Sequence, residues 1–254
     1  MAGSGQLPGV RNAVALLHRL AASPRPLTAG ALSRALSIPR SSTYLLLQVL
    51  EDEGLVRRMP EEHAYTLGLG AFEIGSAYLR HASLEHLARP LLARLARRVG
   101  ETAQLGVLHG NETIYLLKET PPHPTALITE VGIRLPAHLT ASGRSMLSVL
   151  PFKQVLAYFA APGSFPRLTG SGPSTARELH QLLREDAARG WAIERGAVTD
   201  GISCIAAAVR DGAGYPVASV VVSFPSGRHE SHLDTIASDV VAAAAELAHR
   251  LGAP

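Results

Sequence analysis

Residues 26–66 constrain the fold of this chain more than any other segment, because two helical patterns there lie very close together and are followed by two short extended runs. A break at Ser37-Ile38-Pro39 separates the two helical patterns, and Gly54 ends the second. This order predicts a winged helix-turn-helix, a module that places its second helix in the DNA major groove. The expected elements are helices at 28–36 and 40–53 and strands at 55–59 and 63–67.

The charge distribution over this segment also favours DNA. The chain has 254 residues and a net charge of only +3, but its first acidic residue is Glu51. The preceding residues include five arginines, Arg11, Arg19, Arg25, Arg34 and Arg40. Charge of one sign over one module is the pattern expected where phosphates are contacted. Chance clustering of arginine is the alternative, and charge alone does not exclude it.

The second helix has one side suited to packing and another suited to reading bases. Thr43, Leu46, Leu47 and Leu50 fall on the packing side, which leaves the other side to polar and exposed apolar residues. First-turn hydroxyls and arginines suit phosphate, glutamine suits adenine, and an outward leucine suits a thymine methyl. The candidate DNA-binding residues are Arg40, Ser41, Ser42, Tyr44, Leu45, Gln48, Arg57 and Arg58. A helical module that binds only protein would show the same spacing and is the alternative.

Downstream of the wing, the pattern predicts an α+β protein with three parts. They are a winged helix-turn-helix domain at 1–67, a linker helix at 68–81 within a helical pattern that runs to Leu87, and a second domain at 82–254. Helices bracket strand-like runs at 102–108, 113–118, 125–130, 203–209 and 217–224, which favours an antiparallel sheet. Further helices are expected at 10–22, 84–99, 141–150, 151–159, 175–190 and 233–251.

From about Val10 to Gly252 the chain resembles the IclR family of bacterial transcriptional regulators. The resemblance rests on blocks in a fixed order: RSSTYLLLQVLEDEGLV, YTLGLGAFEIG, LARPLLARLARRVGETAQLGVL, VGIRLPAHLTASGRSML and RGWAIERGAVTDGISCIAAAVRD. It implies an N-terminal winged helix-turn-helix, a linker helix and a C-terminal GAF-like domain with an antiparallel sheet that binds a small effector, commonly an organic acid. It also implies a homodimer or tetramer that binds pseudo-palindromic operator DNA as a repressor or an activator.

The same resemblance implies the effector-binding residues, which are Ala141, Ser142, Glu194, Cys204, Val221 and Ser223. The chain departs from the family at two places. Tyr44 and Leu45 replace a basic or His-Arg pair, which implies different operator bases. Val221 replaces a hydroxyl residue of some relatives, which implies a more apolar pocket that suits a larger or aromatic acid.

The residues themselves leave alternatives open at this site. Small residues at 140–143 precede a helix and would leave backbone N–H groups open to a carboxylate, but Thr140 and Ser142 are equally suited to being simple N-caps. Strand alternation places Val221 and Ser223 on one side, where the serine hydroxyl would meet a ligand or the backbone. Glu194 is a pocket acid or an exposed partner of Arg195.

Cys204, the single cysteine, raises the alternative of an enzyme or redox sensor in the second domain, with His138 or His109 as its base. Its apolar strand favours a small buried hydrophobe instead, so we expect no enzyme. One cysteine excludes an intrachain disulfide and a cysteine-rich zinc site, and the spacing of His123 and His138 indicates no metal site. We expect no cofactor. A constitutive architectural protein with an empty sensor domain is a third hypothesis.

Neither a signal peptide nor a transmembrane run is recognisable, so we expect a cytoplasmic protein that does not bind membranes. We expect two copies to associate through residues 10–22, and the linker helix to transmit an effector-dependent change between the domains.

Overall fold

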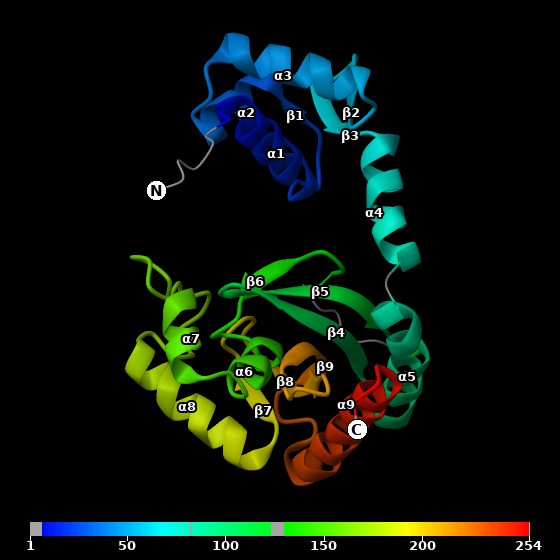
Figure 1. Cartoon of the computed structure of the whole chain (residues 1–254), viewed down its shortest axis with the longest axis vertical. Coiled ribbons are helices and arrows are strands. Elements are labelled where there is room, and N and C mark those ends of the chain that lie inside the picture. The colour runs from blue at the N-terminus through cyan, green and yellow to red at the C-terminus, as the bar shows by residue number, and fades with distance from the viewer. Residues whose placement is uncertain (1–6, 82, 123–129, 254) are drawn as a thin grey trace. The chain divides into compact units, whose positions relative to one another are not determined.

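The computed structural model describes residues 7–81, 83–122 and 130–253 of the chain. The chain divides into two compact units, residues 1–82 and 83–254, which are considered separately (Figure 1). The expected linker helix falls within the first unit by its contacts. The functional division at residues 67 and 81 stays a prediction.

The first unit is a winged helix-turn-helix followed by one further helix. Its elements are α1 (Pro8–Ala21), β1 (Leu27–Thr28), α2 (Ala29–Leu36), α3 (Arg40–Asp52), β2 (Val56–Met59), β3 (Ala64–Leu67) and α4 (Leu69–His81). The strands form an antiparallel sheet in the order β1-β3-β2. This confirms the expected fold of the N-terminal segment and adds β1, which is too short to show a periodic pattern.

The core of this unit lies where α1, α2 and α3 meet. Leu32 of α2 and Leu47 of α3 are fully buried, as the helical spacing predicted. The sequence predicts an apolar side of α1 made of Val14, Leu17 and Leu20 or Ala21. This was wrong in part, because Leu16 and Leu20 enter the core whereas Val14 is 46% exposed. The helix is rotated relative to the expected stripe, since Leu16 and Leu20 lie one turn apart and face the same neighbours.

The second unit is built on one six-stranded antiparallel sheet. Its strands are β4 (Thr102–His109), β5 (Glu112–Glu119), β6 (Arg134–Pro136), β7 (Ala192–Arg195), β8 (Ile202–Arg210) and β9 (Pro216–Pro225). Their order is β6-β5-β4-β9-β8-β7. The α-helices are α5 (Ser83–Val99), α6 (Ala141–Leu147), α7 (Phe152–Tyr158), α8 (Ala176–Arg189) and α9 (Leu233–Arg250). This confirms the α+β class and the antiparallel sheet.

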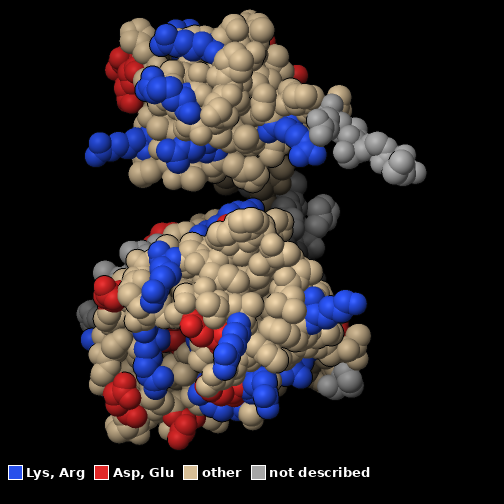
Figure 2. All heavy atoms as spheres, turned by 90° about the vertical axis from the view of Figure 1, so that its left-hand side faces the viewer, with Lys and Arg blue, Asp and Glu red and all other residues tan. Residues whose placement is uncertain are grey.

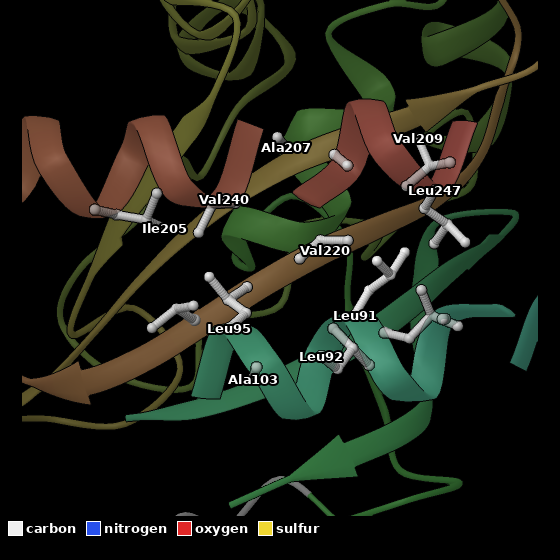
Figure 3. Close-up of a cluster of buried hydrophobic side chains, with 14 of the residues drawn as sticks. Leu91, Leu92, Leu95, Ala103, Ile205, Ala207, Val209, Val220, Val240 and Leu247 are labelled. Atoms are coloured by element: carbon white, nitrogen blue, oxygen red, sulfur yellow. The ribbon is translucent and has the colours of Figure 1, made fainter. Parts of the chain in front are cut away.

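Two helices, α5 and α9, cover one face of this sheet (Figure 1). Figure 3 shows their side chains directed at aliphatic residues of the strands, with Leu92 and Leu95 below Val220 and with Val240 beside Ile205. All five are buried in one continuous cluster. Helix α6 lies against the opposite face, so both faces of the sheet are covered.

Several predicted boundaries were wrong. The helical pattern that was expected to run to Leu87 is two helices, because α4 ends at His81, α5 begins at Ser83 and the boundary between the units falls here. Helix α6 ends at Leu147 and not at residue 150. Strands β6 and β7 were missed because runs of three and four residues are too short for alternation to be recognised. The strand predicted at 125–130 lies almost entirely outside the described residues.

Candidate functional site

The N-terminal end of α3 is open to an anion. The N-cap residue is Pro39, which provides no side-chain hydrogen bond to the first turn. No acidic residue occupies the first turn of α2 or of α3. Unpaired amide N–H groups and the helix dipole together make such an end positive, which favours an anion such as phosphate. Arg40, Ser41 and Ser42 are the first three residues of this helix.

The outward side of α3 is exposed as the sequence predicted. Tyr44 is 51% and Leu45 is 65% exposed, and Gln48 is exposed too, whereas Thr43 and Leu47 are buried. These side chains are therefore free to contact base edges in a groove.

Sequence reasoning missed a further apolar residue on this side. Val49 is 58% exposed and lies four residues after Leu45, so the two side chains share one face of the helix. The signal was available, because a fully helical pattern places residues 45 and 49 together on the side opposite the core.

Two further arginines lie on the wing. Arg57 and Arg58 belong to β2, where they pair with Thr66 and Tyr65 of β3, and both side chains are exposed. Neither they nor Arg40 forms an ion pair with any described residue. Basic side chains are spread over the visible face of this unit (top of Figure 2). Unpaired arginines on an exposed hairpin suit contacts with the DNA backbone.

The second candidate site lies between α6 and the sheet of the second unit. Strand alternation sends Val220 and Val222 to the α5 and α9 side and Val221 to the α6 side, as expected. The side chains that share the α6 side are mostly small or polar. We call this set the inner cluster, and its members are Gln104, Tyr115, Ala141, Ser142, Glu194, Cys204, Ser219, Val221 and Ser223.

Ser142 joins α6 to the sheet. Its Oγ lies 2.5 Å from the Oγ of Ser219, and it also hydrogen-bonds the hydroxyl of Tyr115. The close approach depends on Gly106 of β4, since a Cβ at that position would lie 2.3 Å from the Ser142 Oγ. Burial raises the pKa of Tyr115, as do the nearby Cys204 and Glu194, so the phenol stays neutral and able to donate a hydrogen bond.

The helix cap beside Ser142 is a different residue. Thr140 is the N-cap of α6, and its Oγ1 accepts a hydrogen bond from the Gly143 N–H at 2.9 Å. The alternative in which Ser142 is a simple N-cap was therefore wrong. Ala141 is buried beside it and packs against Val221 and other members of the inner cluster.

A second chain of polar groups runs across four strands, β4, β9, β8 and β7. The Ser223 hydroxyl donates to Oε1 of Gln104 at 3.3 Å, and it lies 3.2 Å from the Cys204 Sγ. Cys204 in turn hydrogen-bonds Glu194, its register partner on β7. The hydroxyl of Ser223 thus contacts other side chains, which corrects the alternative that the backbone satisfies it.

Glu194 ends this chain as a buried acid. The residue is only 2% exposed, and its Oε1 accepts hydrogen bonds from the N–H groups of Ala197 and Val198 at 2.5 and 3.3 Å. The alternative of an exposed ion pair with Arg195 was therefore wrong. Burial raises the pKa of Glu194 above its ordinary value, against the lowering effect of these hydrogen bonds and of Arg144.

Cys204 does not have the surroundings of a nucleophile. Burial and the nearby Glu194 raise the pKa of its thiol well above the ordinary value, whereas a reactive cysteine needs a lowered one. The histidines considered as its base make other contacts. His138 lies 3.1 Å from the Pro166 carbonyl oxygen, and His109 lies 3.4 Å from an Arg134 nitrogen.

A buried ion pair fixes α6 to α8. Arg144 is 6% exposed, its Nε lies 3.1 Å from Oδ2 of Asp186, and its Nη2 donates to the carbonyl oxygen of Ile193. Asp186 also pairs with Arg189 at 2.5 Å. Beside this pair an open hollow of ≈ 410 Å³ leads from the surface to Glu194, with Gln181 and Leu182 of α8 in its wall. The hollow gives the inner cluster a neighbouring opening to solvent.

Four polar residues near this site were not found from the sequence: Thr102, Gln104, Tyr115 and Ser219. All are buried, and the Thr102 hydroxyl has no hydrogen-bond partner among the described residues. The signal was the presence of Thr102 and Gln104 at alternate positions of an otherwise apolar strand. Buried polar side chains at such spacing indicate a polar layer.

The described residues offer neither a cluster of metal ligands nor a helix that could cross a membrane. No group of three or more His, Cys, Asp or Glu among them is arranged to hold a metal ion. Of the helices in the described ranges, none combines the length and the apolar character needed to cross a bilayer.

The sequence matches known proteins along most of its length. A family model described as the IclR helix-turn-helix domain matches residues 9–60. The chain is 32% identical over 218 residues to the HTH-type transcriptional repressor AllR of Klebsiella pneumoniae, which covers 85% of this chain and 79% of that protein. AllR of Escherichia coli K12 is 28% identical with the same coverage.

Solved structures of IclR proteins have a fold similar to that of this chain. The Thermotoga maritima IclR structure has a TM-score of 0.72 and 25% identity, covering 97% of this chain and 100% of that one. An IclR homologue from Microbacterium hydrocarbonoxydans, solved with 4-hydroxybenzoate, has a TM-score of 0.81 and 22% identity over 96% of this chain and 99% of that one. A second family model, the bacterial transcriptional regulator IclR C-terminal, matches residues 76–249, which is well over half of the chain. The chain therefore belongs to the IclR family of DNA-binding transcriptional regulators.

Proposed function

We propose that this regulator is a repressor whose affinity for operator DNA changes when a small organic acid binds in the inner cluster. The DNA contacts would come from Arg40, Ser41, Ser42, Tyr44, Leu45, Gln48, Arg57 and Arg58. The effector contacts would come from Ala141, Ser142, Glu194, Cys204, Val221 and Ser223. The observation that carries the proposal is the coexistence of an exposed recognition helix, with no acidic residue in its first turn, in one unit and a buried polar layer in the other.

The DNA-binding part rests on the exposed side of α3 and on the unpaired wing arginines. Gln48 and Leu45 offer one polar and one apolar base contact, while Arg57 and Arg58 offer charge to the backbone. Repression is proposed because the similar AllR proteins are repressors.

The proposal that an effector binds in the inner cluster rests on the polar character of these buried residues. The buried hydroxyls and the carboxyl group contribute little net stability even though they are hydrogen-bonded to one another, whereas an aliphatic layer in the same space would stabilise the fold more. Val221 makes part of this layer apolar. The homologue solved with 4-hydroxybenzoate suggests a ligand that combines an aromatic ring with polar ends.

We also propose that two copies of the chain associate through the first unit. Leu7, which precedes α1, and Val10 and Val14 of α1 are exposed, and Leu69 and Phe72 of α4 are about 70% exposed. Large apolar side chains at helical spacing that face solvent indicate a protein contact. A second copy would bury them and would present two recognition helices to a two-fold operator.

A gel-shift titration against the DNA upstream of the protein's own gene tests the proposal. We expect preferred binding over random duplex at moderate salt, and we expect Arg40→Ala to weaken it. Addition of 4-hydroxybenzoate and other organic acids should then change the affinity. A protein without preference for any genomic fragment would contradict the DNA-binding part.

The effector part has its own test in thermal shift. A ligand that binds only the folded protein must raise its apparent stability, so at least one acid in a screen should raise the Tm. Absence of any shift would favour a constitutive regulator.

A third measurement addresses the alternative that Cys204 is catalytic or redox-active. Its raised thiol pKa predicts slow labelling by a thiol reagent in the native protein and fast labelling after unfolding. Fast native labelling would support the alternative.

A further inference from the structure

Two arginine side chains converge on Gly30 in the first turn of α2. A Cβ built on this glycine would lie 3.3 Å from Nη2 of Arg40 and 3.6 Å from Nη1 of Arg34. Arg34 belongs to the last turn of α2 and Arg40 begins α3, so the two guanidinium groups come from different helices. They meet over a position that has no side chain of its own.

Two guanidinium groups held close together repel each other, and an anion bound between them relieves this repulsion. Neither Arg34 nor Arg40 forms an ion pair or a side-chain hydrogen bond with a described residue. The first acidic residue in the sequence is Glu51, near the end of α3. The described residues therefore supply two cations at this point and no carboxylate in ion-pair contact with either of them.

We propose that Gly30, Arg34 and Arg40 form a clamp for one phosphate of the DNA backbone. The guanidinium group binds phosphate oxygens in pairs, so two of them suit a single phosphodiester. The clamp rests on the proposed DNA binding and adds Arg34, a residue outside the recognition helix, to the contacts. It would fix the position of α3 on the duplex without reading sequence.

Gly30 matters because its lack of a side chain leaves room for the guanidinium groups of Arg34 and Arg40. Alanine is a better helix former than glycine, so Gly30→Ala should maintain or raise the Tm. Its methyl group would nevertheless lie 3.3 Å from Nη2 of Arg40, so that this guanidinium would have to move by a few tenths of an ångström from the position it takes beside glycine. Stability and DNA affinity should therefore change in opposite directions in this variant.

The salt dependence of DNA binding tests the clamp. Fluorescence anisotropy of a labelled random duplex, titrated at several sodium chloride concentrations, gives the slope of log K against log salt. Loss of one phosphate contact should reduce this slope by about 1. We expect that reduction for Arg34→Ala, a weaker affinity for Gly30→Ala, and no change for Arg210→Ala, which removes the same charge from the second unit. Thermal melts confirm that each variant is folded.

The combined variant adds a sharper criterion. If both arginines bind the same phosphate, the double variant should lose less DNA-binding free energy than the sum of the losses measured for Arg34→Ala and Arg40→Ala alone. A folded Arg34→Ala protein with the wild-type slope would overturn the clamp even if Arg40→Ala weakened binding. A wild-type protein that binds neither random nor genomic duplex would instead refute the proposed function.

Discussion

The two faces of the six-stranded sheet are both buried, yet they consist of different residue types. The face under α5 and α9 is aliphatic, with Leu92, Val220 and Leu247 fully buried in one cluster. The face under α6 carries hydroxyls, a thiol and the carboxyl group of Glu194. Because the same strands supply both faces, alternation along each strand produces the contrast.

The aliphatic face holds the residues that stabilise the unit, and the polar face holds those that would bind a ligand. Burial of aliphatic surface stabilises the fold in proportion to its area. Polar groups in a buried layer contribute little net stability even when they are hydrogen-bonded. We therefore expect substitutions on the α5 and α9 face to affect folding most, and those on the α6 face to affect binding most.

The largest expected effect is on the aliphatic face. Leu92→Ala should lower the free energy of unfolding by about 2–5 kcal/mol, because it leaves a cavity among fully buried neighbours. Urea denaturation would measure the loss. A loss as small as that of a surface substitution would contradict the assignment of this face to stability.

A smaller effect is expected at Gly106 of β4, which lies against Ser142 of α6. In Gly106→Ala the new methyl group would lie 2.3 Å from the Ser142 Oγ and 3.1 Å from the Ser219 Oγ, so Ser142 must rotate and lose its bond to Ser219. Overpacking of this kind costs about 1–3 kcal/mol. Denaturation would measure this cost, and thermal shift with any acid found in the screen should show reduced binding. Normal binding would separate Ser142 from the effector site.

Glu194→Gln should change the pH dependence of stability. A carboxyl group whose pKa is raised on folding favours the folded state below its unfolded pKa, for which the ordinary value is 4.5, and this stability is lost as pH rises through the folded pKa. Glutamine does not titrate, so the variant should gain stability relative to wild type as pH rises above about 4.5.

Parallel thermal melts of both proteins between acid and neutral pH would measure this difference. Asp186, whose pKa burial also raises, is present in both proteins and so does not contribute to it. A constant difference across the pH range would mean that Glu194 is not perturbed by folding.

The smallest stability effect is expected for Tyr115→Phe. The substitution removes a hydroxyl that hydrogen-bonds Ser142 and keeps the ring, so it should cost about 1 kcal/mol. Its effect on acid binding should be larger than its effect on stability. If only stability changed, Tyr115 would be a structural member of the layer.

Much of the fold follows from local sequence patterns. The spacing of Leu32, Leu47 and Leu50 defines the helix-turn-helix core, and the alternation around Val221 assigns each strand residue to a face. These patterns extend over several turns or strand residues, so the periodic signal is strong. Strands as short as β6 and β7 carry no such signal, and they were missed.

The sequence by itself determined the winged helix-turn-helix, the outward side of α3, the α+β class and the family, because each depends on residues close together in the chain or on blocks in a fixed order. Only the tertiary structure decided that Glu194 is buried, that Ser142 of α6 contacts Ser219 of β9, and that Arg34 and Arg40 meet over Gly30. These contacts join separate helices and strands. Sequence spacing does not encode them, because packing between elements sets the burial and direction of each side chain.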